Sequence, residues 1–304
     1  AYNDQLTGNT VKNRIYGGAG NDIISGGDGN DELYGEDGND ILKGEAGDDF
    51  LVSGAGIGDN LLSYSPTDQI DGGAGIDTAS YYTSTMGVIA DLSTGIGLLG
   101  DANGDRYTGV ENLEGSQYND ILTGDSPSSS AKLGSQYNEI PTGDAGDNLL
   151  SGLGGDDALY GLDGNNKIYG GDGADFLSST GSSTMEGGGG INTFITVGTG
   201  VNTIYCGDIN DNITTGAGDD IIHAGEGINV INAGEGNNII YGGSSKDTIT
   251  TGSGNDIIYA YGGDNIINAG AGNNKIYTGS GSDSITTTTG DDIIEAGDGN
   301  NTIN

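Results

Sequence analysis

A repeat of nine residues runs through most of the chain, and it constrains the fold more than any other feature. From Gly17 the sequence reads GGAGNDIIS, GGDGNDELY, GEDGNDILK and GEAGDDFLV. The eighth position carries a large apolar residue, and an isoleucine recurs there every nine residues from Ile204 to Ile303. A disordered chain has no reason to keep a β-branched residue in this register, so we expect a repeat architecture.

Each unit predicts a turn followed by a short strand. Glycines at the second and fourth positions permit the positive φ of a tight turn, and Asp or Asn at the sixth position suits the turn and supplies an oxygen. Positions seven to nine then form a strand whose eighth side chain points inward. Two units make one 18-residue coil with a strand on each side. The sequence therefore predicts an all-β fold, a β-solenoid with two strands per 18-residue coil.

The composition leaves little apolar material for a core and gives the chain a large negative charge. Of 304 residues, 63 are glycine, and 45 acidic residues against 8 basic ones give a formal net charge of -37. Such a charge repels nucleic acid, and no apolar run is long enough to span a membrane. One cysteine excludes a disulfide framework. A folded chain of this kind needs something outside its own sequence to neutralise the charge.

The repeat resembles the GGxGxDxUx nonapeptide of RTX proteins, which form calcium-binding parallel β-rolls. The resemblance implies that the fold of this chain is a right-handed parallel β-roll. The resemblance covers an N-terminal block, residues 1–63, and a regular C-terminal block, residues 143–304. Residues 64–142 between them are expected to form irregular coils, because proline cannot donate to a sheet ladder and all the prolines fall there. These prolines are Pro66, Pro127 and Pro141. The chain opens inside a repeat, so we expect it to be a fragment or a processed form of a longer array.

The resemblance implies Ca²⁺ ions between stacked turns. Calcium takes six to eight oxygen ligands, including backbone carbonyls, and a GxGxD turn presents carbonyls and one carboxylate. Magnesium and zinc fit this donor set less well. Roughly 15–25 ions are expected, a number that would cancel most of the charge. The implied side-chain ligands are Asp22, Asp31, Asp40, Asp49, Asp77, Asp120, Asp157, Asp175, Asp211, Asp220, Asp247, Asp256, Asp283, Asp292, Asn229, Asn238, Asn265, Asn274 and Asn301. The implied carbonyl ligands belong to Gly18, Gly20, Gly27, Gly29, Gly216, Gly218, Gly252 and Gly254.

A second pattern of 36 residues overlies the repeat in the C-terminal block. From Asp211 onward the sixth position reads Asp, Asp, Asn, Asn and so on, so residues 18 apart alternate between Asp and Asn. Two interpretations remain open. Each gap between turns holds an ion between one carboxylate and one amide, with lowered affinity, or asparagine amides stack and half the gaps take no ion.

One outer face of the C-terminal block is predicted to be rich in isoleucine and tyrosine. Such a patch favours a contact surface for another copy or for another part of a longer parent chain, and its alternative role is to stabilise the sheet by pairing between strands. The residues of this face are Tyr205, Ile221, Ile239, Tyr241, Ile257, Tyr259, Tyr277 and Ile293. His223, the single histidine, falls on the same row and is expected to be a solvated surface residue.

The sequence contains no nucleophile elbow, phosphate-binding loop or HExxH site, so we do not expect an enzyme. The expected function is that of a secreted, extracellular calcium-binding structural protein, such as part of a surface layer, a fibril or an adhesin. Expected partners are further copies, the parent chain or a surface polysaccharide, without nucleic acid or membrane insertion. Alternatives are the C-terminal roll of a secreted hydrolase exported by a type I system, and an ice-binding roll.

Overall fold

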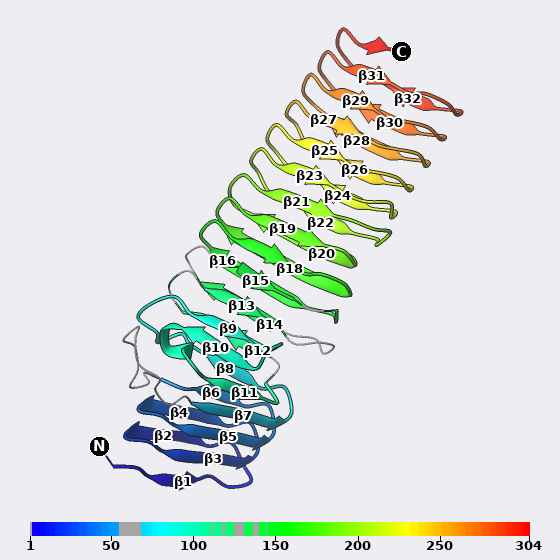
Figure 1. The fold of residues 1–304 in the computed structure, drawn as a ribbon. Helices are drawn as coiled ribbons and strands as arrows, with labels where there is room; N and C mark the ends of the chain where they lie inside the picture. Colours follow the sequence, from blue (N-terminus) through cyan, green and yellow to red (C-terminus); the bar gives the residue numbers. More distant parts are fainter. Residues whose placement is uncertain are drawn as a thin grey trace. The chain divides into compact units, whose positions relative to one another are not determined.

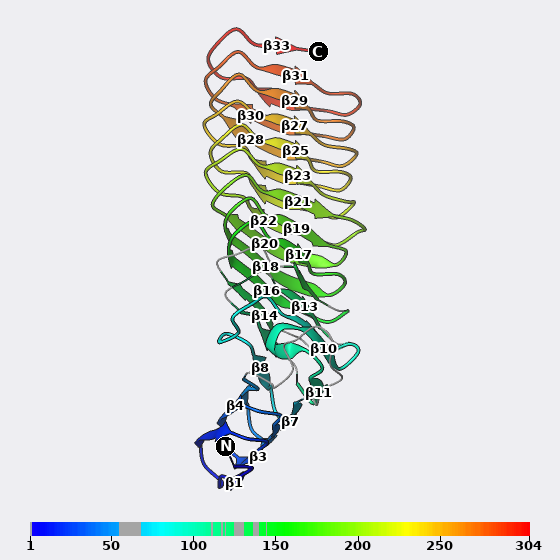
Figure 2. The same ribbon diagram turned by 60° about the vertical axis from the view of Figure 1, so that its left-hand side comes forward.

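The computed structural model of the protein describes residues 2–54, 68–110, 112–116, 118, 120–124, 131–135, 140–143 and 145–304. The chain divides into two compact units, an N-terminal unit of residues 1–152 and a C-terminal unit of residues 153–304. Each unit is a stack of short strands joined by tight turns (Figures 1 and 2). The fold is an all-β parallel β-solenoid, which confirms the fold class predicted from the repeat.

The N-terminal unit is built on two parallel sheets, one on each side of the coil. In the first sheet β1, β3, β5, β7 and β11 pair in that order, and in the second β2, β4, β6, β8, β12 and β14 do so. The elements are β1 (Gln5–Thr7), β2 (Arg14–Ala19), β3 (Ile23–Asp28), β4 (Glu32–Asp37), β5 (Ile41–Ala46), β6 (Phe50–Val52), β7 (Gln69–Ala74), β8 (Thr78–Ser80), β9 (Ile89–Asp91), β10 (Ile96–Leu99), the 3₁₀ turn η1 (Gly100–Ala102), β11 (Arg106–Thr108), β12 (Asn112–Glu114), β13 (Ile121–Thr123), β14 (Ala131–Ser135) and β15 (Ile140–Thr142). Strand β16 (Leu149–Gly154) crosses the division between the units.

The C-terminal unit repeats the same arrangement with greater regularity. Odd-numbered strands form one parallel sheet and even-numbered strands the other, with Ile222 opposite Ile240 and Ile231 opposite Ile249. The partners in these two pairs are 18 residues apart, as the repeat predicts, whereas Ile168 pairs with Met185 at 17 residues and Phe194 pairs with Ile213 at 19. The strands are β17 (Ala158–Tyr160), β18 (Asn165–Asp172), β19 (Phe176–Ser179), β20 (Ser182–Gly188), β21 (Thr193–Thr196), β22 (Thr203–Tyr205), β23 (Asn212–Thr214), β24 (Ile221–His223), β25 (Val230–Asn232), β26 (Ile239–Tyr241), β27 (Thr248–Thr250), β28 (Ile257–Tyr261), β29 (Ile266–Asn268), β30 (Lys275–Thr278), β31 (Ser284–Thr286), β32 (Ile293–Glu295) and β33 (Thr302–Ile303).

The core of each unit is one side chain wide per strand. The eighth-position residues Leu33, Leu42, Ile240 and Ile258 are all 0 % exposed, while their neighbours at positions seven and nine face outward, as strand geometry requires. A single strand buries almost nothing by itself. The core therefore exists only where coils stack.

The segment around residues 89–108 departs from the regular coil. Strand β10 pairs antiparallel with β9 and with β11, and η1 lies between β10 and β11. Pro141 lies in β15 at a core position opposite Leu122. The pairing survives because the neighbouring Ile140 N–H donates to Asp120 O at 3.0 Å. Pro66 and Pro127 lie outside the described residues.

We use rung for one nine-residue unit and edge for the column of rungs that stack 18 residues apart. At the exposed fifth position, side-chain oxygens link successive rungs of an edge. Asn237 N–H donates to Asp219 Oδ1 at 2.6 Å, and Asn255 N–H donates to Asn237 Oδ1 at 2.8 Å. In the part of the chain that the structure describes, no helix has the length and hydropathy needed to cross a membrane.

Candidate metal sites

The sixth position of the repeat holds a buried Asp or Asn that binds its rung to the preceding rung of the same edge. Asp40 Oδ1 accepts a hydrogen bond from the backbone N–H of Asp22 at 2.8 Å, and Asp49 Oδ1 accepts one from the N–H of Asp31 at 2.7 Å. The bonded residues are 18 apart, so this ladder forms only when coils stack. The repeat pattern alone does not predict this structural role.

Both long insertions of the N-terminal unit keep the ladder intact. Asp40 N–H donates to Asp68 Oδ1 at 2.6 Å, and Asp68 N–H donates to Asp105 Oδ1 at 3.2 Å. Asp68 and Asp105 are thus sixth-position residues that sequence analysis missed, since the insertions break the 18-residue spacing. The remaining local signal is an aspartate two residues before a buried apolar residue, Ile70 or Tyr107.

The edge ends differently at Asp105. Its Oδ2 accepts a hydrogen bond from the hydroxyl of Tyr81 at 2.8 Å, and the hydroxyls of Tyr81 and Tyr107 are 2.5 Å apart. All three side chains are buried. The Tyr81 hydroxyl therefore pairs the second oxygen of this last carboxylate within the protein itself.

The second carboxylate oxygen, Oδ2, distinguishes the other Asp rungs. Among the described residues, the buried Oδ2 atoms without a hydrogen-bond partner include those of Asp22, Asp31, Asp40, Asp49, Asp68, Asp175, Asp211, Asp220, Asp247, Asp256 and Asp283. A buried carboxylate oxygen without a partner is costly unless a proton or a cation neutralises it. Each of these rungs consequently presents an oxygen that requires a positive partner.

The surroundings of these oxygens suit a calcium ion. A Cβ built on Gly17 would lie 2.6 Å from Asp22 Oδ2 and 2.8 Å from Gly35 O, so the glycine leaves open a space that oxygens of two successive rungs share. Within the described ranges, no three Asp, Glu, His or Cys side chains gather as a metal site. A single carboxylate per rung would therefore act together with backbone carbonyls, which is a donor set that calcium accepts and zinc does not.

The structure refines the predicted carbonyl ligands. The carbonyls of Gly216 and Gly252 accept the N–H groups of Glu235 and Ala271 at 3.0 and 3.1 Å, which leaves each with one further lone pair. First-position carbonyls such as Gly35 O border the same space as the orphaned carboxylate oxygen. These carbonyls were not predicted, because the repeat pattern gives the first glycine no evident role in the site.

The other predicted side-chain ligands lie on the same ladders. Asp77 Oδ1 accepts the Asp49 N–H at 2.7 Å, and Asp157 N–H donates to Asp175 Oδ1 at 2.9 Å. Asp120 differs, because its Oδ2 accepts the Ser116 N–H at 2.7 Å and its Oδ1 accepts the Ser116 hydroxyl. Asp120 is therefore the weakest candidate ligand of the predicted set.

The alternation in the C-terminal unit follows the predicted order. Along one edge Asp211 N–H donates to Asn229 Oδ1 and Asn229 N–H donates to Asp247 Oδ1, both at 2.9 Å. The same edge continues through Asn265 and Asp283 to Asn301. The other edge passes through Asp220, Asn238, Asp256, Asn274 and Asp292. From Asp211 to Asp283, every Asp rung is therefore followed on its edge by an Asn rung.

Burial shifts the titration of the ladder carboxyls. It raises the pKa of Asp40, Asp175, Asp211 and Asp247 to about 6 in each case. Burial also raises the pKa of Asp68, and the charge of Asp105 adds to that effect. The cause is the same throughout, because a low-dielectric site favours the neutral acid.

These shifts predict that the calcium-free protein is more stable in mild acid than at neutral pH. With pKa values of about 3.9 in the unfolded chain and about 6 in the folded one, the folded state binds more protons between these values. Stability therefore falls as pH rises through this window. In excess chelator we expect the C-terminal unit, which holds Asp175, Asp211 and Asp247, to melt roughly 10 °C higher at pH 4.5 than at pH 7. Equal or lower thermal stability at pH 4.5, measured by circular dichroism, would contradict the raised pKa values of the buried carboxyls.

The predicted isoleucine and tyrosine face forms a stacked column on the C-terminal unit. His223 lies between Tyr205 and Tyr241, with ring centroids 4.8 and 4.5 Å away and planes within 7° of parallel. Tyr259 and Tyr277 continue the column at 5.3 and 5.1 Å. His223 is half-buried in this stack and is not the solvated residue expected from the sequence. The rings thus stabilise the sheet by contacts between neighbouring strands.

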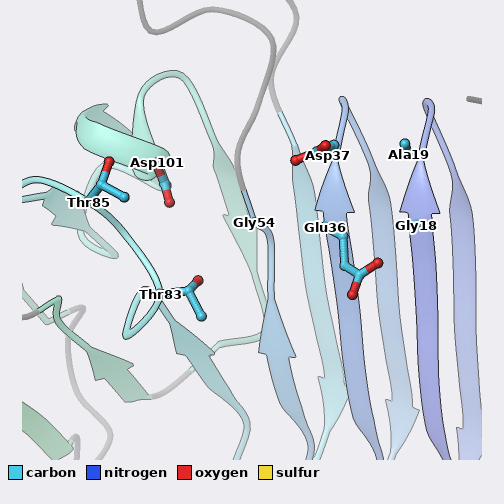
Figure 3. Close-up of a pocket in the computed structure, with 8 residues that line it drawn as sticks. All are labelled: Gly18, Ala19, Glu36, Asp37, Gly54, Thr83, Thr85 and Asp101. Atoms are coloured by element: carbon cyan, nitrogen blue, oxygen red, sulfur yellow. The ribbon is translucent and has the colours of Figure 1, made fainter.

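A separate pocket in the N-terminal unit carries three carboxylates (Figure 3). Glu36 and Asp37 lie at the end of β4 and Asp101 lies in η1, while the rest of the lining comes from Gly18, Ala19, Gly54, Thr83 and Thr85. None of these residues belongs to the sixth-position ladder. The pocket is therefore distinct from the candidate metal sites.

Comparison with known families agrees with this geometry. The family model of the RTX calcium-binding nonapeptide repeat matches more than half of the chain. The matched residues are 1–33, 25–58, 107–126, 142–177, 196–231, 223–258, 241–276 and 277–304. A comparison with curated proteins gives no match. The repeats of this family bind calcium, and with them the chain takes up multiple Ca²⁺ ions. The protein therefore belongs to the family of RTX calcium-binding nonapeptide repeat proteins.

Proposed function

We propose that this protein is an extracellular structural element that calcium holds in its folded form, and that it is not an enzyme. The observation that carries the proposal is the run of buried, partnerless Oδ2 atoms on consecutive rungs, such as Asp22 and Asp40 on one edge and Asp31 and Asp49 on the other. When bound, calcium supplies the positive charge that these oxygens lack. The ladder aspartates and the neighbouring carbonyls would hold it.

A location outside the cell follows from the chemistry of such sites. Extracellular calcium modules work with dissociation constants of about 10⁻⁴–10⁻³ M, a concentration that the cytosol does not reach. RTX repeats typically occur in secreted proteins. A long array of similar rungs suits a part of a surface layer, a fibril or an adhesin, because such roles need length and rigidity more than a reactive centre.

The stacked column on the C-terminal unit supports lateral self-association as its mode of assembly. Tyr205 is 43 % exposed and Ile293 is 50 % exposed, so the face keeps apolar area that a second copy can cover. The faces of the stacked rings are occupied by their neighbours, which leaves little ring surface for a sugar. A protein partner therefore suits this face better than a polysaccharide.

Assembly in calcium tests this proposal. In about 2 mM calcium the wild-type chain is expected to self-associate, and the double variant Tyr241→Ser/Ile239→Ser is expected to weaken association by roughly tenfold or more. Sedimentation velocity measures the association, and calcium binding measured in parallel should not change. The matched control is Val230→Ser/Thr248→Ser on the opposite sheet. Equal association of both double variants and the wild type would overturn the role of this face.

A further inference from the structure

The sixth-position asparagines of the C-terminal unit differ from the sixth-position aspartates in one heavy atom of the side chain, and that atom is the one at the candidate metal site. Asn229, Asn238, Asn265 and Asn274 are all 0 % exposed. Their Oδ1 atoms accept the backbone N–H of the preceding rung, as the Oδ1 atoms of the aspartates do. The amide nitrogen Nδ2 consequently takes the place of the orphaned carboxylate oxygen.

The amide nitrogen donates to carbonyls of its own turn. Asn265 Nδ2 lies 3.1 Å from both Gly262 O and Gly263 O, and Asn238 Nδ2 lies 3.2 Å from Gly236 O. A carboxylate oxygen in the same place has no hydrogen to offer these carbonyls. On an Asp rung the carboxylate oxygen and the carbonyl oxygens of the turn would therefore lie close together and repel one another. Only a cation or a proton between them can remove that repulsion. On an Asn rung the amide N–H groups remove it by donating hydrogen bonds to the carbonyls.

The first position of the repeat changes together with the sixth. From Cys206 onward every rung with a sixth-position Asn has alanine at its first position: Ala224, Ala233, Ala260, Ala269 and Ala296. The rungs with a sixth-position Asp have threonine, cysteine or glycine there: Cys206, Thr215, Gly242, Thr251, Thr278 and Thr287. Two positions five residues apart thus follow the same alternation.

Threonine hydroxyls complete the hydrogen bonding of three of the five Asn rungs, those that begin at Ala233, Ala269 and Ala296. The rungs that precede Ala224 and Ala260 begin with Cys206 and Gly242, which have no hydroxyl. The hydroxyl of Thr215 donates to Ala233 O at 2.8 Å, and that of Thr251 donates to Ala269 O at 2.8 Å. In the rung of Asn238, the side-chain oxygen, the amide nitrogen, the fourth-position carbonyl and the first-position carbonyl therefore all have partners. None of these four groups lacks a hydrogen-bond partner, whereas each Asp rung from Asp211 to Asp283 keeps a buried carboxylate oxygen without one.

We propose that the sixth-position asparagines replace calcium in this chain. Their amide groups hydrogen-bond the turn carbonyls that an ion would otherwise bind. From Asp211 onward calcium therefore binds on alternate rungs of each edge, at the aspartates alone. The proposal rests on the proposed function, because it assumes that the aspartate rungs bind calcium. It decides between the two interpretations of the 36-residue pattern in favour of amide rungs without ions.

Counting bound ions on the full chain tests the proposal. Native mass spectrometry resolves single calcium ions on a protein of 30.4 kDa. The variant Asn238→Asp is expected to bind one calcium ion more than the wild type at saturation. The matched control Asn237→Asp makes the same change of charge one residue away, at the exposed fifth position, and is expected to bind the same number as the wild type.

The reciprocal variant Asp256→Asn keeps the test decisive if Asn238→Asp does not fold. An asparagine already occupies the equivalent place in the rungs on either side, so this variant should fold and should bind one ion fewer than the wild type. Unchanged ion counts in Asn238→Asp, or in Asp256→Asn, overturn the inference while the wild type still binds calcium. A wild-type chain that binds no calcium at all overturns the proposed function, and the inference falls with it.

Discussion

Removing calcium with a chelator at neutral pH is expected to unfold the N-terminal unit. Its ladder aspartates follow one another on every rung, with Asp22, Asp40 and Asp68 on one edge. At a rung spacing of about 4.8 Å, two such charges repel by roughly 3 kcal/mol at an effective dielectric constant of 20. A core one side chain wide cannot offset several such repulsions together with the entropy of the chain.

Hydrogen exchange measured by mass spectrometry on the full chain checks this expectation. Peptides that cover residues 23–46 should exchange about a hundredfold faster or more in chelator than in calcium. Peptides that cover residues 230–268 should change less, because half of the rungs there carry asparagine. Magnesium should restore little protection, since it demands octahedral geometry and gives up water reluctantly. Full protection of residues 23–46 in chelator would mean that the orphaned oxygens need no cation.

Truncation of one core residue is expected to have the second largest effect. Ile240→Ala removes a side chain that is 0 % exposed and stacks between Ile222 and Ile258. The free energy of unfolding should fall by about 2–5 kcal/mol, because the rungs on either side cannot close the cavity without breaking their register.

The neighbouring residue provides a matched control for this truncation. Ile239→Ala makes the same chemical change at the outward, half-buried seventh position, and it should cost less than about 1 kcal/mol. Urea unfolding in saturating calcium, followed by circular dichroism, measures both variants. Equal losses for the two variants would contradict a core built from the eighth position alone.

The periodicity of the sequence was enough to predict the strands, the core and the pairing of coils. Ile222, Ile240 and Ile258 are spaced for a single stack, and no other regular arrangement brings them together. The alternation of Asp211, Asn229 and Asp247 along one edge followed from the same spacing. These features depend only on counting residues, so the sequence contains them directly.

The hydrogen bonding of the ladder side chains could not be predicted from residue spacing. That Asp40 Oδ1 accepts the N–H of Asp22 while Oδ2 remains without a partner depends on the height and tilt of one coil over the next. Asp68 and Asp105 were missed because their insertions have no fixed length, and only the closed coil shows that they continue the edge. The stacked environment of His223 likewise depends on rings contributed by two other strands.

The two side-chain ladders of the turns have a mechanical consequence. At the sixth position the earlier rung donates to the later one, whereas at the fifth position the later rung donates to the earlier one. Each coil therefore both donates hydrogen bonds to the next coil and accepts them from it, and these ladders link no coils farther apart. Under tension a unit of this kind would unfold one coil at a time. Each 18-residue coil that unfolds would lengthen the extended chain by roughly 60 Å.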